Sequence, residues 1–93
     1  MSRPHRTLHG ELLYTSRAPG REGHERGREF FTTTTHADGS RTLQAHCEID
    51  DPPPVVRDVT LAFGPHGRPT DCAVRLSVGD RFAGSSWFRF RER

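Results

Sequence analysis

An Asp-Gly pair between two extended runs is the feature that most limits what this chain can fold into. Residues 37–40 read Ala-Asp-Gly-Ser, after Phe-Phe-Thr-Thr-Thr-Thr at 30–35 and before an alternating run at 43–49. Asp-Gly favours a two-residue type I′ hairpin turn, because that turn needs positive φ at both central residues. The pair therefore predicts an antiparallel β-hairpin in the middle of the chain.

The rest of the chain alternates between strand-like segments and turns. Gly64-Pro65-His66-Gly67 and Gly79-Asp80 are two further turn signals, and the prolines at 52–54 predict a corner because they cannot donate to a ladder. The expected strands cover residues 7–16, 28–36, 41–50, 55–63, 69–78 and 81–90. Since most links are short, we predict an all-β, antiparallel up-and-down meander of about six strands, as a half-barrel or small open barrel.

The composition predicts a thin core. Hydrophobic residues are 31% of the 93 residues, whereas globular domains usually have about 45–50%, glycine included. An open sheet this small needs a ligand, a partner or a second copy to cover it. We expect a single β domain over residues 1–93 that forms a homodimer, through its phenylalanine-bearing face or its edges. A last strand at 81–90 would be an exposed edge, so either another chain pairs with it or the natural protein continues beyond Arg93.

Charge and motif patterns argue against several classes of function. All 14 basic residues are arginine, but 12 carboxylates are interspersed and the net charge is only +2, so we expect no nucleic-acid partner. No signal peptide and no apolar run of about 20 residues is visible, which predicts a cytoplasmic protein without a membrane span. Metal-ligand spacings and a phosphate loop are missing, so we expect neither metal nor cofactor.

The two cysteines, Cys47 and Cys72, each fall on an apolar strand face. Such a position favours buried free thiols in a cytoplasmic protein. Spacing alone also allows a single disulfide bridge between them.

Register assigns residues to the two faces of a sheet, because side chains alternate along each strand. A two-residue turn at Asp38-Gly39 places Phe31 opposite His46, on the face away from the aliphatic side chains. The same register places Glu29 opposite Glu48, where two carboxylates repel each other. Either an arginine such as Arg75 lies between them, one carboxyl has a raised pKa, or the register slips.

The last hairpin decides where the other aromatic residues lie. A two-residue turn at Gly79-Asp80 places Trp87 opposite Cys72 on the aliphatic face. It turns Phe82, Phe88 and Phe90 to the opposite face, beside Arg75. A three-residue loop with a bulge would do the reverse, with Trp87 on the polar face and the phenylalanines in the core.

Aromatic walls with a few polar groups are typical of a ligand cavity. We therefore expect binding of a small hydrophobic or amphipathic molecule, whose carboxylate or phosphate would suit an arginine. Alternatively, His46 and Glu48 would be the acid–base pair of a barrel-type isomerase, hydratase or cyclase, or the aromatic face would serve only for assembly. His and Glu also alternate on ordinary solvated strands. The candidate ligand-binding residues are Phe31, His46, Glu48, Arg75, Phe82, Phe88 and Phe90.

Six strands with tight turns over residues 7–90 resemble the front half of a lipocalin-like or calycin-type β-barrel, and related bacterial half-barrels that carry lipophilic molecules. The resemblance rests on strand rhythm. The lipocalin Gly-x-Trp signature is missing, because Glu11-Leu12 follows Gly10 and the only tryptophan, Trp87, lies in the last strand. Residues 46–60 and 74–90 also resemble a bacterial family of longer proteins. The resemblances imply a barrel-type fold and a lipophilic ligand, and they carry over no functional residue.

Overall fold

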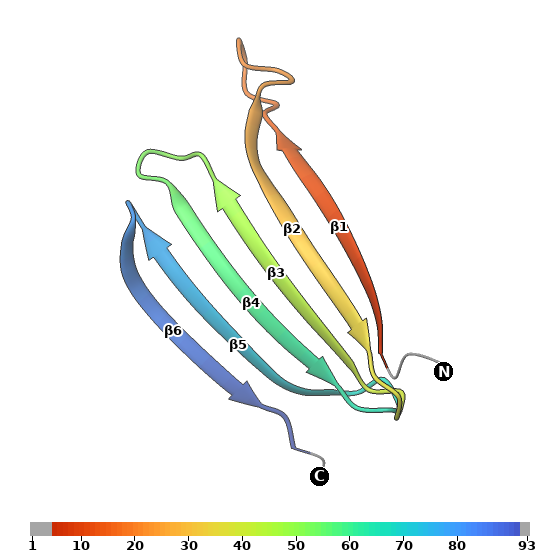
Figure 1. The fold of residues 1–93 in the computed structure, drawn as a ribbon. Helices are drawn as coiled ribbons and strands as arrows, with labels where there is room; N and C mark the ends of the chain where they lie inside the picture. Colours follow the sequence, from red (N-terminus) through yellow and green to blue (C-terminus); the bar gives the residue numbers. More distant parts are fainter. Residues whose placement is uncertain (1–4, 92–93) are drawn as a thin grey trace.

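The structure, a computed structural model, describes residues 5–91 and shows one six-stranded antiparallel sheet (Figure 1). The strands lie in chain order, and β1 and β6 are the two open edges. This confirms the predicted all-β meander, as an open sheet. Within the described part there is no helix long and apolar enough to cross a membrane. The strands are β1 (Arg6–Thr15), β2 (Glu25–Thr35), β3 (Arg41–Ile49), β4 (Val55–Phe63), β5 (Pro69–Val78) and β6 (Arg81–Arg89).

The turn between β2 and β3 is longer than predicted. The N–H of His36 donates to the Ser40 carbonyl (2.8 Å), and the N–H of Gly39 donates to the His36 carbonyl (3.0 Å). Gly39 has φ of 87°, but Asp38 is not in the positive-φ region that a type I′ turn requires. Instead, the Asp38 carboxylate accepts hydrogen bonds from the Ser40 N–H (2.9 Å) and hydroxyl (2.6 Å). The predicted two-residue turn is wrong, because a type I turn closed by a glycine bulge forms here.

This turn shifts the β2–β3 register by one residue, and a one-residue shift exchanges the faces of a strand. Phe30 lies opposite His46, and Phe31 lies opposite Ala45. Phe31 is therefore on the aliphatic face, and the predicted pairing of Phe31 with His46 is wrong. Its ring lies over Gly10 of β1, because a Cβ built on Gly10 would be only 2.1 Å from the ring.

The turn between β5 and β6 has the predicted length. Gly79 and Asp80 both have positive φ, 59° and 61°, as a type I′ turn requires. Val78 therefore lies opposite Arg81. The two-residue turn expected from the sequence is present.

A bulge further along β6 reverses the faces that the turn would have set. Ser77 lies opposite Phe82, but Leu76 lies opposite Gly84, so Ala83 is an extra residue in β6. Beyond the bulge, Trp87 lies opposite Ala73 and Phe88 lies opposite Cys72. The faces expected for Trp87 and Phe88 from the two-residue turn alone are therefore wrong, and those of the bulged alternative are observed for both.

Opposed residues share a face, so the register defines two surfaces. The polar face carries His46 and Glu48. The aliphatic face carries both thiols, which are free as predicted, with Cys47 buried and Cys72 half-buried. The apolar and aromatic side chains of the aliphatic face are Leu8, Leu12, Tyr14, Phe31, Leu43, Ala45, Cys47, Ile49, Val55, Val59, Leu61, Phe63, Cys72, Val74, Leu76, Val78 and Phe88.

No second layer covers the aliphatic face. Among the described hydrophobic residues only Cys47 is buried, at 2% exposure. The chain exposes 7494 Å², about 2,000 Å² more than the roughly 5,400 Å² expected of a compact protein of this mass. Its radius of gyration is 16.4 Å, against about 12 Å for a compact domain of this length. The described fold is one layer of a protein without a core of its own.

Candidate functional site

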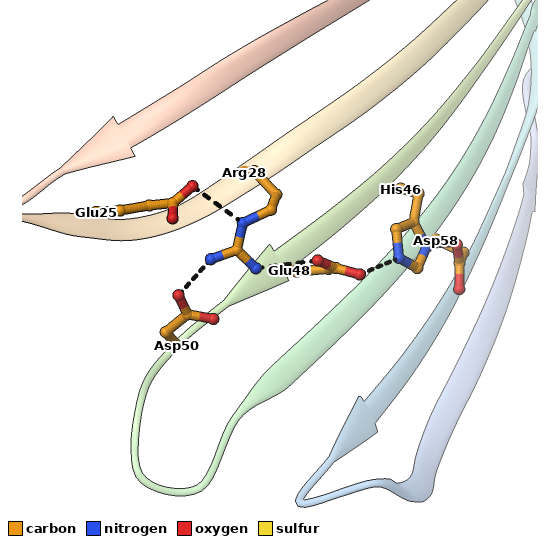
Figure 2. A network of polar contacts seen from close by, with 6 residues as sticks. All are labelled: Glu25, Arg28, His46, Glu48, Asp50 and Asp58. Carbon is orange, nitrogen blue, oxygen red and sulfur yellow. Dashed lines mark hydrogen bonds and ion pairs between the residues drawn. The ribbon is translucent and has the colours of Figure 1, made fainter.

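A chain of alternating charges crosses the polar face from β2 to β4 (Figure 2). Its positive members are Arg28 on β2 and His46 on β3. Each positive group lies between carboxylates, which come from three strands and from the loop after β3. The six residues are Glu25, Arg28, His46, Glu48, Asp50 and Asp58. We call this set the charge ladder.

Arg28 binds three carboxylates at one end of the ladder. It donates from Nη1 to Glu48 Oε1 (3.0 Å), from Nε to Glu25 Oε1 (3.3 Å), and from Nη2 to Asp50. Arg28 lies directly opposite Glu48 across the β2–β3 pair. Hydrogen bonds from Arg28, and then from His46, lower the pKa of Glu48. The expected clash between Glu29 and Glu48 is thus absent, because the register slips there.

His46 lies between two carboxylates at the other end of the ladder. Its Nδ1 is 2.6 Å from Asp58 Oδ1, and its Nε2 is 3.0 Å from Glu48 Oε2. Ionised carboxylates only accept hydrogen bonds, so the doubly protonated imidazolium is the form of His46 that satisfies both contacts. The hydrogen bond to Asp58, followed by that to Glu48, raises the pKa of His46.

This geometry suits a charge bridge better than acid–base catalysis. A general base needs an unprotonated nitrogen within reach of a substrate, and both nitrogens of His46 are bonded to Asp58 and Glu48. A shallow depression of about 330 Å³ borders His46, with Phe30 and Thr60 on its walls. A substrate there would have to displace a carboxylate to reach the ring. The ladder therefore links three strands on an otherwise open surface.

The structure does not bring the predicted ligand-binding residues together. His46, Glu48, Arg75 and Phe82 share the polar face, whereas Phe31 and Phe88 lie on the aliphatic face. Phe90 follows β6 and borders a separate depression. On the polar face the Arg75 guanidinium is 4.7 Å from the centre of the Phe82 ring. The predicted set is therefore split between both faces of the sheet.

Sequence reasoning missed four of the six ladder members, Glu25, Arg28, Asp50 and Asp58, and two of these lie directly opposite the residues it found. Asp58 lies opposite His46, and Arg28 lies opposite Glu48. The pattern that would reveal them is charge complementarity between neighbouring strands, which a register with Arg28 opposite Glu48 satisfies and the assumed register does not. No protein family, curated protein or solved structure matches this chain.

The ladder predicts a window of pH in which it stabilises the fold. The contribution of His46 is fully present below the ordinary imidazole pKa of 6.5 and is lost as pH rises through the raised folded value. The contribution of Glu48 is present above the ordinary pKa of 4.5 and is lost as pH falls through its lowered folded value. Both contributions are fully present between pH 4.5 and pH 6.5. Because His46 and Glu48 are partly exposed to solvent, the ladder contributes only modestly to the stability of the fold.

Thermal melts across pH, together with NMR titration of the imidazole protons, measure this effect. We expect His46 to titrate above 6.5, and the melting temperature to fall as pH rises through that titration. The variant His46→Gln should remove this alkaline loss. A His46 that titrates at or below the ordinary value would contradict the double hydrogen bond.

Proposed function

We propose that this chain is a self-associating β-module, in which two copies pack their aliphatic faces against each other. The observation that carries the proposal is the missing core: the aliphatic face, which is apolar except for residues such as Glu29 and Arg57, has no second layer within the described residues. Sheets need such a layer, because a single open sheet buries too little apolar surface to pay for chain ordering. Two sheets packed face to face, about 10 Å apart, would form one shared core.

The surface area matches a stable dimer. Each copy exposes 7494 Å², about 2,000 Å² above the value for a compact chain of its mass. Removing this excess from both copies would bury about 4,000 Å² in total, within the range of about 2,000–5,000 Å² for obligate homodimers. Folding and association would then be coupled, and stability would depend on concentration.

Sedimentation equilibrium on the whole chain tests the proposal. We expect twice the 10.5 kDa chain mass at micromolar concentration, and a melting temperature that rises with protein concentration. A monomer with a sharp, concentration-independent melt would overturn it.

Binding of an amphipathic ligand is the second candidate, favoured by one depression on the aliphatic face. This depression has a volume of about 440 Å³, and Tyr14, Cys47, Ile49 and Arg57 line it. An arginine within an apolar surface would suit the carboxylate of a lipophilic acid. Native mass spectrometry of freshly purified protein tests this candidate through a retained mass, which Arg57→Gln should remove.

A further inference from the structure

The exposed apolar side chains gather at the two edges of the sheet. Among the large hydrophobic residues that are most exposed, Phe30 alone lies on an inner strand. Leu12 and Leu13 on β1 are 48% and 58% exposed, and Trp87 and Phe88 on β6 are 62% and 53% exposed. Each edge therefore carries an adjacent apolar pair, with one side chain on each face. An open edge also leaves backbone donors and acceptors unpaired.

Backbone hydrogen bonds show which residues of each edge strand direct their N–H and C=O groups away from the sheet. The Phe90 N–H donates to the Thr70 carbonyl (2.9 Å). Because backbone groups alternate in direction along a strand, those of Phe88 also face β5, whereas those of Trp87 face away from the sheet. The Ser16 N–H donates to the His24 carbonyl (2.8 Å), so by the same alternation Leu13 points away from β2. The outward-pointing residues are Glu11, Leu13 and Thr15 on β1, and Ser85, Trp87 and Arg89 on β6.

If β6 of one copy pairs with β1 of another, one register allows backbone hydrogen bonds and also matches the side chains of the two strands. Leu13 opposite Trp87 aligns outward-pointing groups on both strands, as a hydrogen-bonded antiparallel pair requires. The next pair places Leu12 opposite Phe88, and both lie on the aliphatic face. The pair beyond Leu12, in the same direction, places Glu11 opposite Arg89, an acid against a base on the polar face.

We infer that two copies join edge to edge, β6 of each pairing with β1 of the other in this register, so that the dimer closes into a continuous ring of strands. The inference rests on the proposed self-association and names its contacts. A two-fold axis between the facing sheets, roughly along the strands, makes both joints identical. Since β1 and β6 run in opposite directions, each joint is antiparallel. The aliphatic faces point inward, and no strand edge remains open.

A second copy fits this role better than closure within one chain. β1 and β6 are the far edges of the open sheet (Figure 1), and four strands lie between them, a separation of about 24 Å at the usual strand spacing. Closure within one chain would need the sheet to bend until these edges met. A second copy offers a partner strand to both edges, and it also covers the aliphatic face.

The pairing of β6 with β1 can be tested by exchanging the charges of Glu11 and Arg89, which face each other in the proposed register. Glu11→Arg and Arg89→Glu each place like charges in contact, and the two-fold axis repeats each change. We expect each single variant to weaken the dimer about tenfold, as measured by sedimentation equilibrium. The double variant Glu11→Arg/Arg89→Glu restores opposite charges and should return the dissociation constant to near that of the unmodified chain. Its matched control, Glu11→Arg/Arg81→Glu, has the same net charge but changes an arginine outside the joint, so it should stay weak.

Amide hydrogen exchange on the unmodified dimer gives a second measurement, which does not depend on variants that fold. In a closed ring the N–H groups of Leu13 and Trp87 are protected, whereas on open edges they exchange as solvent-exposed amides. A dimer with unprotected edge amides and no rescue in the double variant would overturn the edge pairing and leave the proposed self-association standing. A chain that is monomeric throughout would overturn both.

Discussion

Gly27→Ala is expected to destabilise the fold by about 3 kcal/mol, at the upper end for overpacking a tight site. A Cβ at Gly27 would lie 2.3 Å from the carbonyl oxygen of Glu48 and 3.2 Å from the Cα of Ile49. Both contacts are with backbone, which cannot move without breaking the β2–β3 pairing. Gly27 also adjoins the bulge at Arg26, where β2 turns sharply. Urea unfolding followed by circular dichroism measures the loss.

Gly10→Ala is the matched control on the same face. A Cβ there would also clash, at 2.1 Å, but with the far end of the Phe31 ring. No second layer holds this ring in the described fold, so it can rotate away. We expect Gly10→Ala to cost about 1 kcal/mol or less, because only side-chain repacking is needed. Equal losses in the two variants would show that the close approach of β2 and β3 at Gly27 is not required.

Local signals in the sequence were enough to predict the six strands and the positions of the turns between them. Gly79-Asp80 forms the expected two-residue turn, and all six expected strands are present. These features depend on residues within a few positions of each other, so alternation and turn chemistry reveal them. The sequence could also place His46 and Glu48 on one face, because they are two residues apart on one strand.

The predictions failed where one extra residue changes the register. The turn at Ala37-Asp38-Gly39 includes one residue more than a type I′ turn, and Ala83 is an additional residue in β6. The first exchanges the two faces of β2 relative to the other strands, and the second exchanges the faces of β6 beyond Ala83. The bulge at Ala83 lies next to Gly84, and an isolated glycine within a strand is the local signal that would have indicated it. The predicted aromatic pocket depended on both registers and was divided for that reason.

The cross-strand charges on the polar face explain why the actual register is preferred there. In the expected register Glu29 would have faced Glu48, whereas the observed register pairs Arg28 with Glu48 and His46 with Asp58. Opposite charges across a strand pair are favourable and like charges are not. The charge ladder therefore selects a register at the exposed surface, where packing alone would specify it weakly. The ladder thereby helps to align strands whose other face forms the shared core in the proposed dimer.

The aliphatic face provides the second large prediction. Val59 lies at its centre, opposite Ala45 on β3 and Val74 on β5, and it is half-buried by its own sheet. In the proposed dimer a carboxylate at this position would be buried between the facing aliphatic surfaces, which costs about 3 kcal/mol for each copy. We therefore expect Val59→Asp to weaken association more than about 10³-fold and to lower the melting temperature at every concentration.

Thr60→Asp is the control, since Thr60 is the next residue of β4, exposed on the polar face opposite Gln44 and Ala73. It adds the same charge to the same strand, but at a surface that stays in water in the dimer. We expect Thr60→Asp to keep the mass of the dimer and to change stability by about 0.5 kcal/mol or less. Sedimentation and concentration-dependent melts on both variants separate the faces. If Thr60→Asp dissociates the protein and Val59→Asp does not, the partner covers the polar face, and the charge ladder rather than the aliphatic surface lies at the interface.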